Sequence, residues 1–562
     1  MHNHNLGIGL LNQHSPEIIV TLGPSFSKKE DIISSINFGI RYFRQPLAYK
    51  NQDHFSQYLL VKEIAEGQNP PCFIIPDFPS DRLRVGKIKN SIKYKRNTKL
   101  SIVDKKATNR QDEIPIPGIK KHINNISVGG SLLIRDGNIS IKIKDKTKTS
   151  LLGSVYFAKQ RIKTNNNIVF TNFDITINQL TPGDISYLNE LKVAGQIPLY
   201  INISLVKNAS DILRCRKQLS EIYGKCIPKI MTKVETEPAL ENISDIIRES
   251  DCIMVARGDL ATAINVEKLP HIQHSIITMC KIMNKPVIVA TQMLENFADY
   301  SIPNRSELND VALAVRQRAS AIMLSRETSG SKKPLAVIKL AKKIIDHELS
   351  NLPKHNIPYG NRFPIVAIEG IDGVGKTSVA KVLAKSIKGD YINTPPVDYK
   401  PLKLFFELPE RSAKARLLFY AGSLWEIWEN IIERCKVRPV VLDRYTLSTL
   451  LYHETLLNED IFNIYNNAFP PNADITISLD VSEKTVMNRL QEKATKSFDT
   501  DLENDRVLQR NLAKKYKKYS QYVINTDLLT IDQVVKKCIR IIKNYINNNK
   551  SDSEQIPSTD LQ

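Results

Sequence analysis

The chain has 562 residues and a formal net charge of +20, from 79 Lys and Arg against 59 Asp and Glu. This length exceeds one compact core and predicts about two to four domains. Seven cysteines without paired spacing argue against a disulfide framework. We also find neither an apolar run of membrane-spanning length nor a signal-peptide pattern at the start, so a cytoplasmic enzyme is expected.

The positive charge leaves a nucleic-acid partner open without favouring it. The densest basic run, KIKNSIKYKRNTK at residues 87–99, belongs to no recognisable nucleic-acid motif. We interpret the charge as a solvated face or as attraction for anionic substrates, and a polyanion contact is the less favoured alternative.

The first half of the chain contains eight short runs of buried-strand type, most of them separated by helical patterns. They lie at 18–22, 41–45, 72–77, 198–205, 227–234, 252–257, 286–291 and 321–325. Eight strand–helix units predict a (β/α)8 TIM barrel, built from residues 16–86 and 175–349, with its active site at the carboxyl ends of the strands. The long gap at residues 87–174 predicts an inserted, small β-rich domain.

The second half predicts a separate parallel α/β domain. Residues 350–362 are rich in Pro, Asn and Gly and indicate a linker, and residues 363–545 form the predicted domain. Its strands are expected at 364–369, 439–443, 475–480 and 522–525. Residues 1–15 are an N-terminal tail, and the polar tail at 546–562 is expected to be disordered.

Charged residues follow several predicted barrel strands. Arg44, Asp77, Lys233, Glu235 and Asp259 all fall at strand ends, which share one rim of a barrel. Glu235 and Asp259 supply the hard oxygen ligands that Mg²⁺ prefers, and Arg44 and Lys233 suit a phosphate. The rim therefore predicts a divalent cation and an anionic substrate.

Six motifs of this half resemble pyruvate kinase: TLGPS, KVET, IMVARGDLA, PVIVATQMLEN, RSELNDVALAV and IMLSRET. The insertion resembles the B domain of that family, and no counterpart of its C-terminal regulatory domain is found. The resemblance implies that Glu235 and Asp259 bind Mg²⁺ with phosphoenolpyruvate, while Arg44 and Lys233 stabilise the transferring phosphoryl group. The other implied contacts are Thr291 and the backbone of Arg257, Gly258 and Asp259 for the substrate carboxylate, and Arg84 for the nucleotide phosphates.

Some positions depart from the pyruvate kinase pattern. Pro46, Ala48 and Phe78 stand where the family has K⁺ ligands, and Arg82 replaces a glutamate associated with K⁺ dependence. The resemblance then implies that K⁺ is not required and that the Arg82 guanidinium takes its place. The alternative is that Arg82 is a surface charge beside a decayed site.

The second half carries EGIDGVGKTS at residues 369–378, which fits the phosphate-binding loop G-x-x-x-x-G-K-[ST] between a strand and a helix. Backbone N–H groups of such a loop cradle the phosphates of ATP, Lys376 reaches the β and γ oxygens, and Thr377 binds Mg²⁺. The predicted ATP contacts in the loop are Gly370, Asp372, Gly373, Val374, Gly375, Lys376, Thr377 and Ser378.

Asp372, the DRY run at 443–445 and LDVSEKTVMNRLQEK at 479–493 resemble thymidylate kinase. The resemblance implies that Asp372 contacts the sugar of the acceptor, Arg444 its phosphate and Phe419 its base, with Asp443 at the metal-bound water. Arg489, Lys493 and Lys496 would belong to a lid, or else to a solvated helix. The Arg-Glu-Pro motif of the family is absent and its base-reading arginine is Ser423, so the acceptor is thymidylate, another nucleoside monophosphate or a nucleoside.

These features together predict a bifunctional phosphotransferase that raises a nucleoside monophosphate to a triphosphate with ATP and phosphoenolpyruvate. Three alternatives remain: a catalytically silent or phosphoenolpyruvate-sensing barrel beside one active kinase, a Mg²⁺-dependent lyase acting on oxaloacetate, and a charge-driven nucleic-acid binder. A homo-oligomer is possible, and the sequence predicts neither its size nor any coupling between the halves.

Overall fold

The computed structural model describes residues 16–48, 52–66, 68, 70–80, 83–134, 138–164, 166, 168–170, 179–351, 362–408, 410–461, 468–486 and 506–549. The predicted N-terminal tail, residues 352–361 of the predicted linker, Arg82 and the predicted lid residues Arg489, Lys493 and Lys496 lie outside these ranges.

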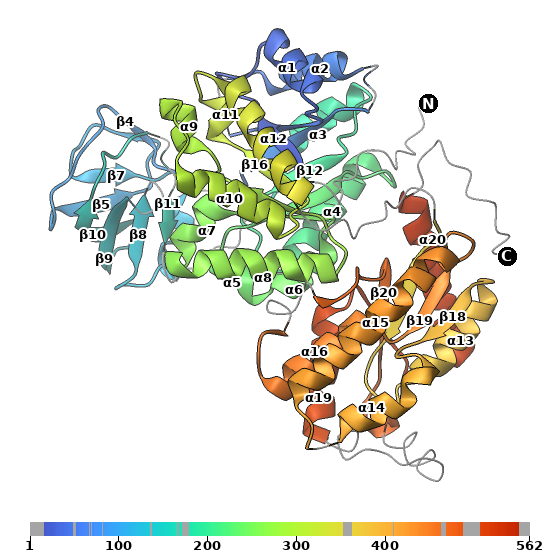
Figure 1. The fold of residues 1–562 in the computed structure, drawn as a ribbon. Coiled ribbons are helices and arrows are strands. Elements are labelled where there is room, and N and C mark those ends of the chain that lie inside the picture. The colour runs from blue at the N-terminus through green and yellow to red at the C-terminus, as the bar shows by residue number, and fades with distance from the viewer. Residues whose placement is uncertain are drawn as a thin grey trace.

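The first half forms a closed barrel of eight parallel strands, as the sequence predicts (Figure 1). In chain order its strands are β1 (Glu17–Thr21), β2 (Tyr42–Pro46), β3 (Phe73–Phe78), β12 (Tyr200–Ile203), β13 (Lys229–Val234), β14 (Cys252–Ala256), β15 (Val287–Ala290) and β16 (Ala321–Leu324). The surrounding helices are α1 (Lys29–Asn37), α2 (His54–Ala65), α3 (Pro182–Val193), α4 (Ala209–Tyr223), α5 (Glu237–Glu241), α6 (Ile243–Glu249), α7 (Arg257–Ala263), α8 (Leu269–Ile282), α9 (Glu295–Tyr300), α10 (Arg305–Arg316), α11 (Arg326–Ser329) and α12 (Pro334–Asn351).

Burial on both faces explains why the barrel strands are apolar runs without alternation. In β14, Cys252 and Met254 pack inside the barrel, while Ile253 and Val255 pack against the surrounding helices. A strand covered on both faces needs apolar side chains in both directions, which is why CIMVA reads as a continuous run.

A small β domain is inserted between β3 and α3, on the left of Figure 1. Its larger sheet has the order β11-β8-β9-β10-β5-β7, and β4 pairs with β6. The strands are β4 (Lys87–Ile88), β5 (Lys99–Val103), β6 (Ala107–Thr108), β7 (Glu113–Pro115), β8 (Ser131–Ile134), β9 (Ile139–Lys146), β10 (Ser150–Ala158) and β11 (Ile168–Phe170). Its core is separate from that of the barrel.

The second half is a five-stranded parallel sheet of order β18-β19-β17-β20-β21 with helices around it. The strands are β17 (Ile365–Glu369), β18 (Asp390–Asn393), β19 (Val440–Asp443), β20 (Ile475–Asp480) and β21 (Tyr522–Asn525). The helices are α13 (Lys376–Ser386), α14 (Lys400–Glu407), α15 (Ala413–Cys435), α16 (Thr446–Leu457), α19 (Arg506–Tyr519) and α20 (Ile531–Asn549). The edge strand β18 was not predicted, and α20 continues past the domain end expected at residue 545.

The two halves contact each other through α6 and the end of α8 on one side and α19 with the segment before β20 on the other. Asn284 Nδ2 donates to the Asp474 carbonyl at 2.9 Å, and Asn472 Nδ2 donates to the Lys281 carbonyl at 3.2 Å.

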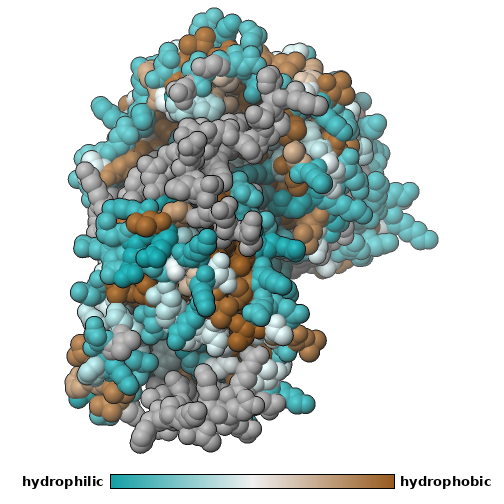
Figure 2. Space-filling model, turned by 90° about the vertical axis from the view of Figure 1, so that its right-hand side faces the viewer, coloured by the Kyte–Doolittle hydropathy of each residue, from teal (hydrophilic) through white to brown (hydrophobic). Residues whose placement is uncertain are grey.

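On the face shown in Figure 2, hydrophobic residues form separate patches among hydrophilic ones. Within the described ranges, no helix is both long and apolar enough to cross a membrane.

Candidate active sites

Three charged side chains meet at the barrel rim. Arg44 donates from Nε to Asp77 at 2.6 Å, and Lys233 Nζ lies 3.1 Å from the other Asp77 oxygen. Burial by itself would raise the pKa of Asp77, but the charges of Arg44 and Lys233 outweigh it and lower that pKa. Arg44 and Lys233, both predicted phosphate ligands, are therefore brought together by Asp77, which the sequence placed on the same rim.

The two predicted Mg²⁺ ligands follow neighbouring strands. Glu235 comes directly after β13, is buried and accepts the Leu205 N–H at 2.7 Å, and Asp259 lies in the first turn of α7, just after β14. Strands β13 and β14 are paired. Among the described residues no group of three or more His, Cys, Asp or Glu side chains forms a metal cluster. Two carboxylates nonetheless fit Mg²⁺, which usually keeps waters and substrate oxygens as its other ligands.

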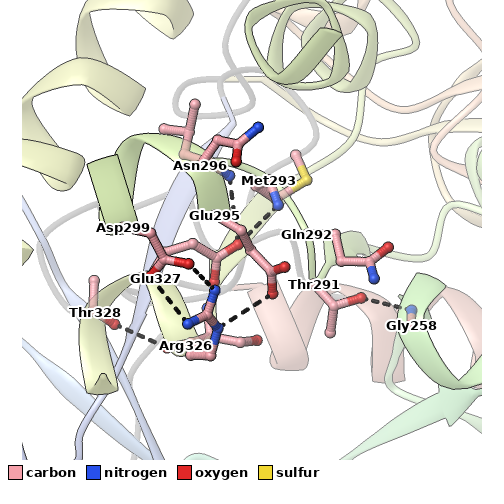
Figure 3. Close-up of polar contacts among 12 residues, drawn as sticks. Gly258, Thr291, Gln292, Met293, Glu295, Asn296, Asp299, Arg326, Glu327 and Thr328 are labelled. Atoms are coloured by element: carbon pink, nitrogen blue, oxygen red, sulfur yellow. Dashed lines mark hydrogen bonds and ion pairs between the residues drawn. The ribbon is translucent and has the colours of Figure 1, made fainter. Parts of the chain in front are cut away.

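Thr291 and Gln292 form an unusual turn after β15, with φ of 70° and 54°. Such angles are strained for residues with a side chain, above all for β-branched Thr. The turn is clamped by Arg257, whose guanidinium donates to the Thr291 and Gln292 carbonyls at 2.8 and 2.7 Å. Thr291 Oγ1 in turn accepts the Gly258 N–H at 2.7 Å (Figure 3). The predicted carboxylate-binding groups Gly258 and Thr291 are thus adjacent and bonded to each other.

A buried carboxylate supports this turn from behind. Glu327 is fully buried, and its Oε1 accepts the Met293 N–H at 2.8 Å. Its second oxygen accepts the Ser325 N–H at 2.7 Å. The neighbouring Arg326 pairs with Asp299 at 2.8 Å, as Figure 3 shows. Glu327 lies within the IMLSRET motif, but no role was predicted for it, because its bond to the backbone N–H of Met293 joins segments that are distant in sequence.

Phe78 and Pro46, which stand where the family has K⁺ ligands, are both buried. Phe78 is fully buried against Tyr187, with ring centroids 6.4 Å apart, and Pro46 is buried beside it on the paired strand β2. The Phe78 carbonyl accepts the Ser204 hydroxyl at 2.6 Å.

The predicted nucleotide contact Arg84 is half-buried in the segment between the barrel and β4.

The phosphate-binding loop joins β17 to α13 and takes a conformation that requires glycine. Gly370, Gly373 and Gly375 have φ of 137°, 77° and 102°. At Gly370 a Cβ would also lie 2.7 Å from the Leu479 carbonyl oxygen. The loop leads into the N-terminus of α13, where Thr377 and Ser378 are exposed. The backbone N–H groups of such a helix N-terminus are suited to bind phosphate.

The charged groups of this site are paired. Lys376 Nζ donates to the Ile371 carbonyl at 2.6 Å and lies 3.5 Å from Asp372, and burial lowers the pKa of Lys376 to about 8. Arg444, whose φ of 65° is again unusual, donates to Asp372. Asp443 accepts the Tyr391 hydroxyl at 3.0 Å. The structure thus brings Asp372, Lys376 and Arg444 together, and their roles stay predictions.

A cavity of about 360 Å³ opens beside these residues, within the usual size of small-molecule sites. Its lining includes Gly370, Asp372, Arg444, Tyr420, Tyr452 and His453. Phe419, the predicted base-stacking residue, is not among the lining residues and stacks on Phe406, with ring centroids 5.0 Å apart. The next residue, Tyr420, lines the cavity instead, so a role for Phe419 stays a prediction.

Comparison with known proteins agrees with this description of both halves. The pyruvate kinase barrel-domain family matches residues 13–338, and the thymidylate kinase family matches residues 368–538. The chain belongs to the pyruvate kinase family, and a thymidylate kinase domain follows its barrel.

Relatives of the barrel come from several kingdoms. Pyruvate kinase of Thermotoga maritima is 29% identical over 59% of this chain and 70% of its own length, and the chloroplastic isozyme G of Nicotiana tabacum is 30% identical over 60% of each. A crystal structure of a pyruvate kinase from Cryptosporidium parvum matches with a TM-score of 0.55 at 22% identity, covering 84% of this chain and 94% of that one. At this identity the structural match shows the fold alone.

Proposed function

We propose that the chain is a bifunctional phosphotransferase. Its thymidylate kinase domain transfers a phosphoryl group from ATP to a nucleoside monophosphate, with thymidylate the first candidate. Its barrel transfers a phosphoryl group from phosphoenolpyruvate to the resulting diphosphate or to ADP and releases pyruvate. The observation that carries the proposal is that Asp372, within the phosphate-binding loop, lies 3.5 Å from Lys376 and accepts a bond from Arg444, since the lysine for the donor phosphates and a cation for the acceptor phosphate are then neighbours.

In the thymidylate kinase domain, the residues present fit the chemistry of phosphoryl transfer. Lys376 would exchange its bond to the Ile371 carbonyl for phosphate oxygens, and Arg444 would hold the acceptor phosphate in line. Thr377 and Asp443 are the groups that would hold Mg²⁺ and its waters. When bound, Mg²⁺ supplies charge neutralisation to the phosphates.

In the barrel, Arg44 and Lys233 would stabilise the charge of the transferring phosphoryl group. The Gly258 N–H and Thr291 would receive the substrate carboxylate in exchange for their mutual hydrogen bond. Glu235 and Asp259 would hold Mg²⁺ between the carboxylates and the substrate. Phe78 and Pro46 offer no side-chain oxygen to a monovalent cation, so this reaction would proceed without K⁺.

A second candidate is a barrel that binds phosphoenolpyruvate without turning it over. The pairing of Asp77 with both Arg44 and Lys233 favours it, because two cations already neutralised by a buried carboxylate attract a phosphate less strongly. In that case only the thymidylate kinase domain would turn over.

Single-site variants separate the two activities. Lys376→Met should lower ATP-dependent formation of a nucleoside diphosphate about 100-fold and leave pyruvate release from phosphoenolpyruvate and ADP unchanged. Asp259→Ala should lower pyruvate release and leave ATP-dependent formation of the nucleoside diphosphate unchanged. Pyruvate release that is absent in the unmodified protein, with and without K⁺, would refute the barrel reaction and support the second candidate.

A further inference from the structure

Helix α14 has the reverse of the usual amphipathic arrangement. Its charged residues Lys403 and Glu407 are half-buried and line the cavity beside the phosphate-binding loop. Its apolar residues Leu402, Leu404 and Phe405 are exposed. A helix on a protein surface usually buries its apolar side chains and exposes the charged ones. A charged helix face that is turned toward a cavity therefore indicates a polar ligand.

The cavity lies on one side of the phosphate-binding loop. Residues 370–372 of the loop line it, whereas residues 373–377, the predicted cradle of the ATP phosphates, are not among the described residues that do. Its other walls are residues 393–396 at the end of β18 and beyond, three residues of α14, and residues of α15, α16 and α19 with the segment before α16. An anion bound in this cavity would therefore lie on the acceptor side of the loop.

Three cations act on one carboxylate at this end of the cavity. Asp372 accepts a bond from Arg444 and lies 3.5 Å from Lys376 Nζ. Burial alone would raise the pKa of Asp372. The charges of Arg444 and Lys376 outweigh burial and lower that pKa, and the charge of Lys403 adds to their effect. Asp372 offsets only one of these positive charges, so the site attracts a further anion.

The ion pair of Lys403 is of a kind that a ligand can replace. Lys403 Nζ lies 3.7 Å from Glu407 Oε1, one helical turn further on, and the Lys403 side chain is 40% exposed. Ion pairs of this kind on one helix contribute little to stability. Glu407 also accepts the Tyr420 hydroxyl at 2.5 Å, so it keeps a partner when Lys403 moves away. Lys403 is therefore both accessible from the cavity and free to exchange Glu407 for a phosphate.

We propose that Lys403 is a further substrate-binding residue of the thymidylate kinase domain, which holds the phosphate of the acceptor together with Arg444. The inference rests on the proposed function of this domain and adds a residue that binds its substrate. Lys400 is three residues earlier on the same face of α14, also lines the cavity and adds to the attraction. The phosphate belongs either to a nucleoside monophosphate or to ATP, and the inference commits to the monophosphate.

Calorimetric titration of the full chain without ATP tests the inference, with the four common deoxynucleoside monophosphates and their nucleosides as ligands. Lys403→Gln removes the charge and should weaken binding of the preferred monophosphate about 10-fold, while the matching nucleoside, which lacks the phosphate, binds as before. Lys403→Arg keeps the cation and should recover most of the affinity. In kinetic assays of Lys403→Gln, the KM for the monophosphate should rise about 10-fold and the KM for ATP should stay unchanged. Lys536→Gln, at an exposed lysine of α20, is the matched control and should change none of these values.

The outcomes separate this inference from the proposed function. If Lys403→Gln binds the monophosphate normally, the inference is wrong while the proposed function stands. A rise in the KM for ATP alone would place Lys403 on the donor side, and an equal loss of monophosphate and nucleoside binding would show that it shapes the cavity; either result overturns the inference. If no nucleoside monophosphate binds to the unmodified protein, the proposed function of this domain and the inference are refuted together. Fluorescence of Trp425 and Trp428, both in α15, reports whether each variant is folded.

Discussion

Glu369 is a buried carboxyl at the end of β17, and burial raises its pKa to about 7. It accepts the Tyr445 N–H at 2.9 Å and the Ser448 hydroxyl. In the unfolded chain the same group loses its proton near pH 4.5. Between about pH 4.5 and 7 the folded state therefore binds the proton more tightly. This contribution to stability is fully present below pH 4.5 and is lost as the pH rises to 7.

Glu369→Gln should remove this pH dependence. Trp425 and Trp428 are the only two tryptophans of the sequence, so urea unfolding followed by their fluorescence reports the thymidylate kinase domain alone. From pH 5 to pH 8 the free energy of unfolding of the unmodified domain should fall by about 2.5 kcal/mol more than that of Glu369→Gln. Parallel losses in the two proteins would show that Glu369 titrates normally.

Asp77 holds two cations at the barrel rim, and its removal should leave them buried without a counter-charge. Asp77→Ala is expected to destabilise the barrel by about 3 kcal/mol, measured by chemical unfolding followed by circular dichroism. Asp346→Ala is the control, because its pairing with Lys342 at 3.5 Å is exposed and should contribute less than about 1 kcal/mol. Equal effects of the two substitutions would contradict the role given to Asp77.

At the scale of elements, the turn after β15 depends on groups that are distant in sequence. Thr291 and Gln292 keep their strained angles because Arg257 binds their carbonyls and Glu327 binds the next N–H groups. A strained turn that is held from several sides presents Thr291 in one fixed orientation. Glu327 is thus a positioning residue for the predicted carboxylate site.

Glu327→Ala should release the turn. We expect the KM for phosphoenolpyruvate to rise about 10-fold and the barrel to lose about 3 kcal/mol of stability, since hydrogen bonds to a charged acceptor are worth about 1.5–3 kcal/mol each. Glu327→Gln keeps one accepting oxygen, so its KM and its stability should lie between those of the unmodified protein and Glu327→Ala. Pyruvate-release kinetics and a melting temperature that both stay unchanged in Glu327→Ala would contradict this account.

The sequence predicts the elements whose pattern is set by burial. Most of the eight barrel strands were predicted because apolar side chains on both faces give continuous runs, whereas the strand at 41–45, RYFRQ, has polar residues at both ends. Strand β18, with the sequence DYIN, was missed because it is short, polar at both ends and only partly buried at the edge of its sheet. The motif residues Lys376, Asp372 and Arg444 were predicted from the phosphate-binding loop and the resemblance. Glu327 lies within the IMLSRET motif, but its role could not be predicted, because its bond to the Met293 N–H joins the ends of two different strands.

At the scale of the molecule, the two halves touch through both polar and apolar contacts, and Ile282 of α8 is part of the core of the second half. The Arg248 guanidinium of α6 donates to the Lys517 carbonyl at the end of α19, and Tyr519 packs against both cores. Helix α19 also lines the cavity beside Asp372 and Arg444 through Tyr516. The order of the motifs along the chain predicts two domains, whereas this contact depends largely on backbone carbonyls and could not be predicted.

Arg248→Ala should remove the hydrogen bond from α6 to the Lys517 carbonyl at the carboxyl end of α19. We expect the thymidylate kinase domain to lose about 1 kcal/mol, measured by tryptophan fluorescence during urea unfolding. Asp245→Ala breaks the 2.6 Å bond between Asp245 and Arg248 without touching α19, and it should have less than half of that effect. An unchanged midpoint in Arg248→Ala would show that the contact contributes no stability.

The central claim is that both halves transfer phosphoryl groups in sequence, and one chromatogram tests it. The protein is incubated with Mg²⁺, excess phosphoenolpyruvate, a trace of ATP and thymidylate, without added K⁺. The account predicts thymidine triphosphate far in excess of the ATP supplied, with one pyruvate released for each phosphoryl group added. Diphosphate formed only up to the amount of ATP, without pyruvate, would contradict it and leave the barrel without kinase activity.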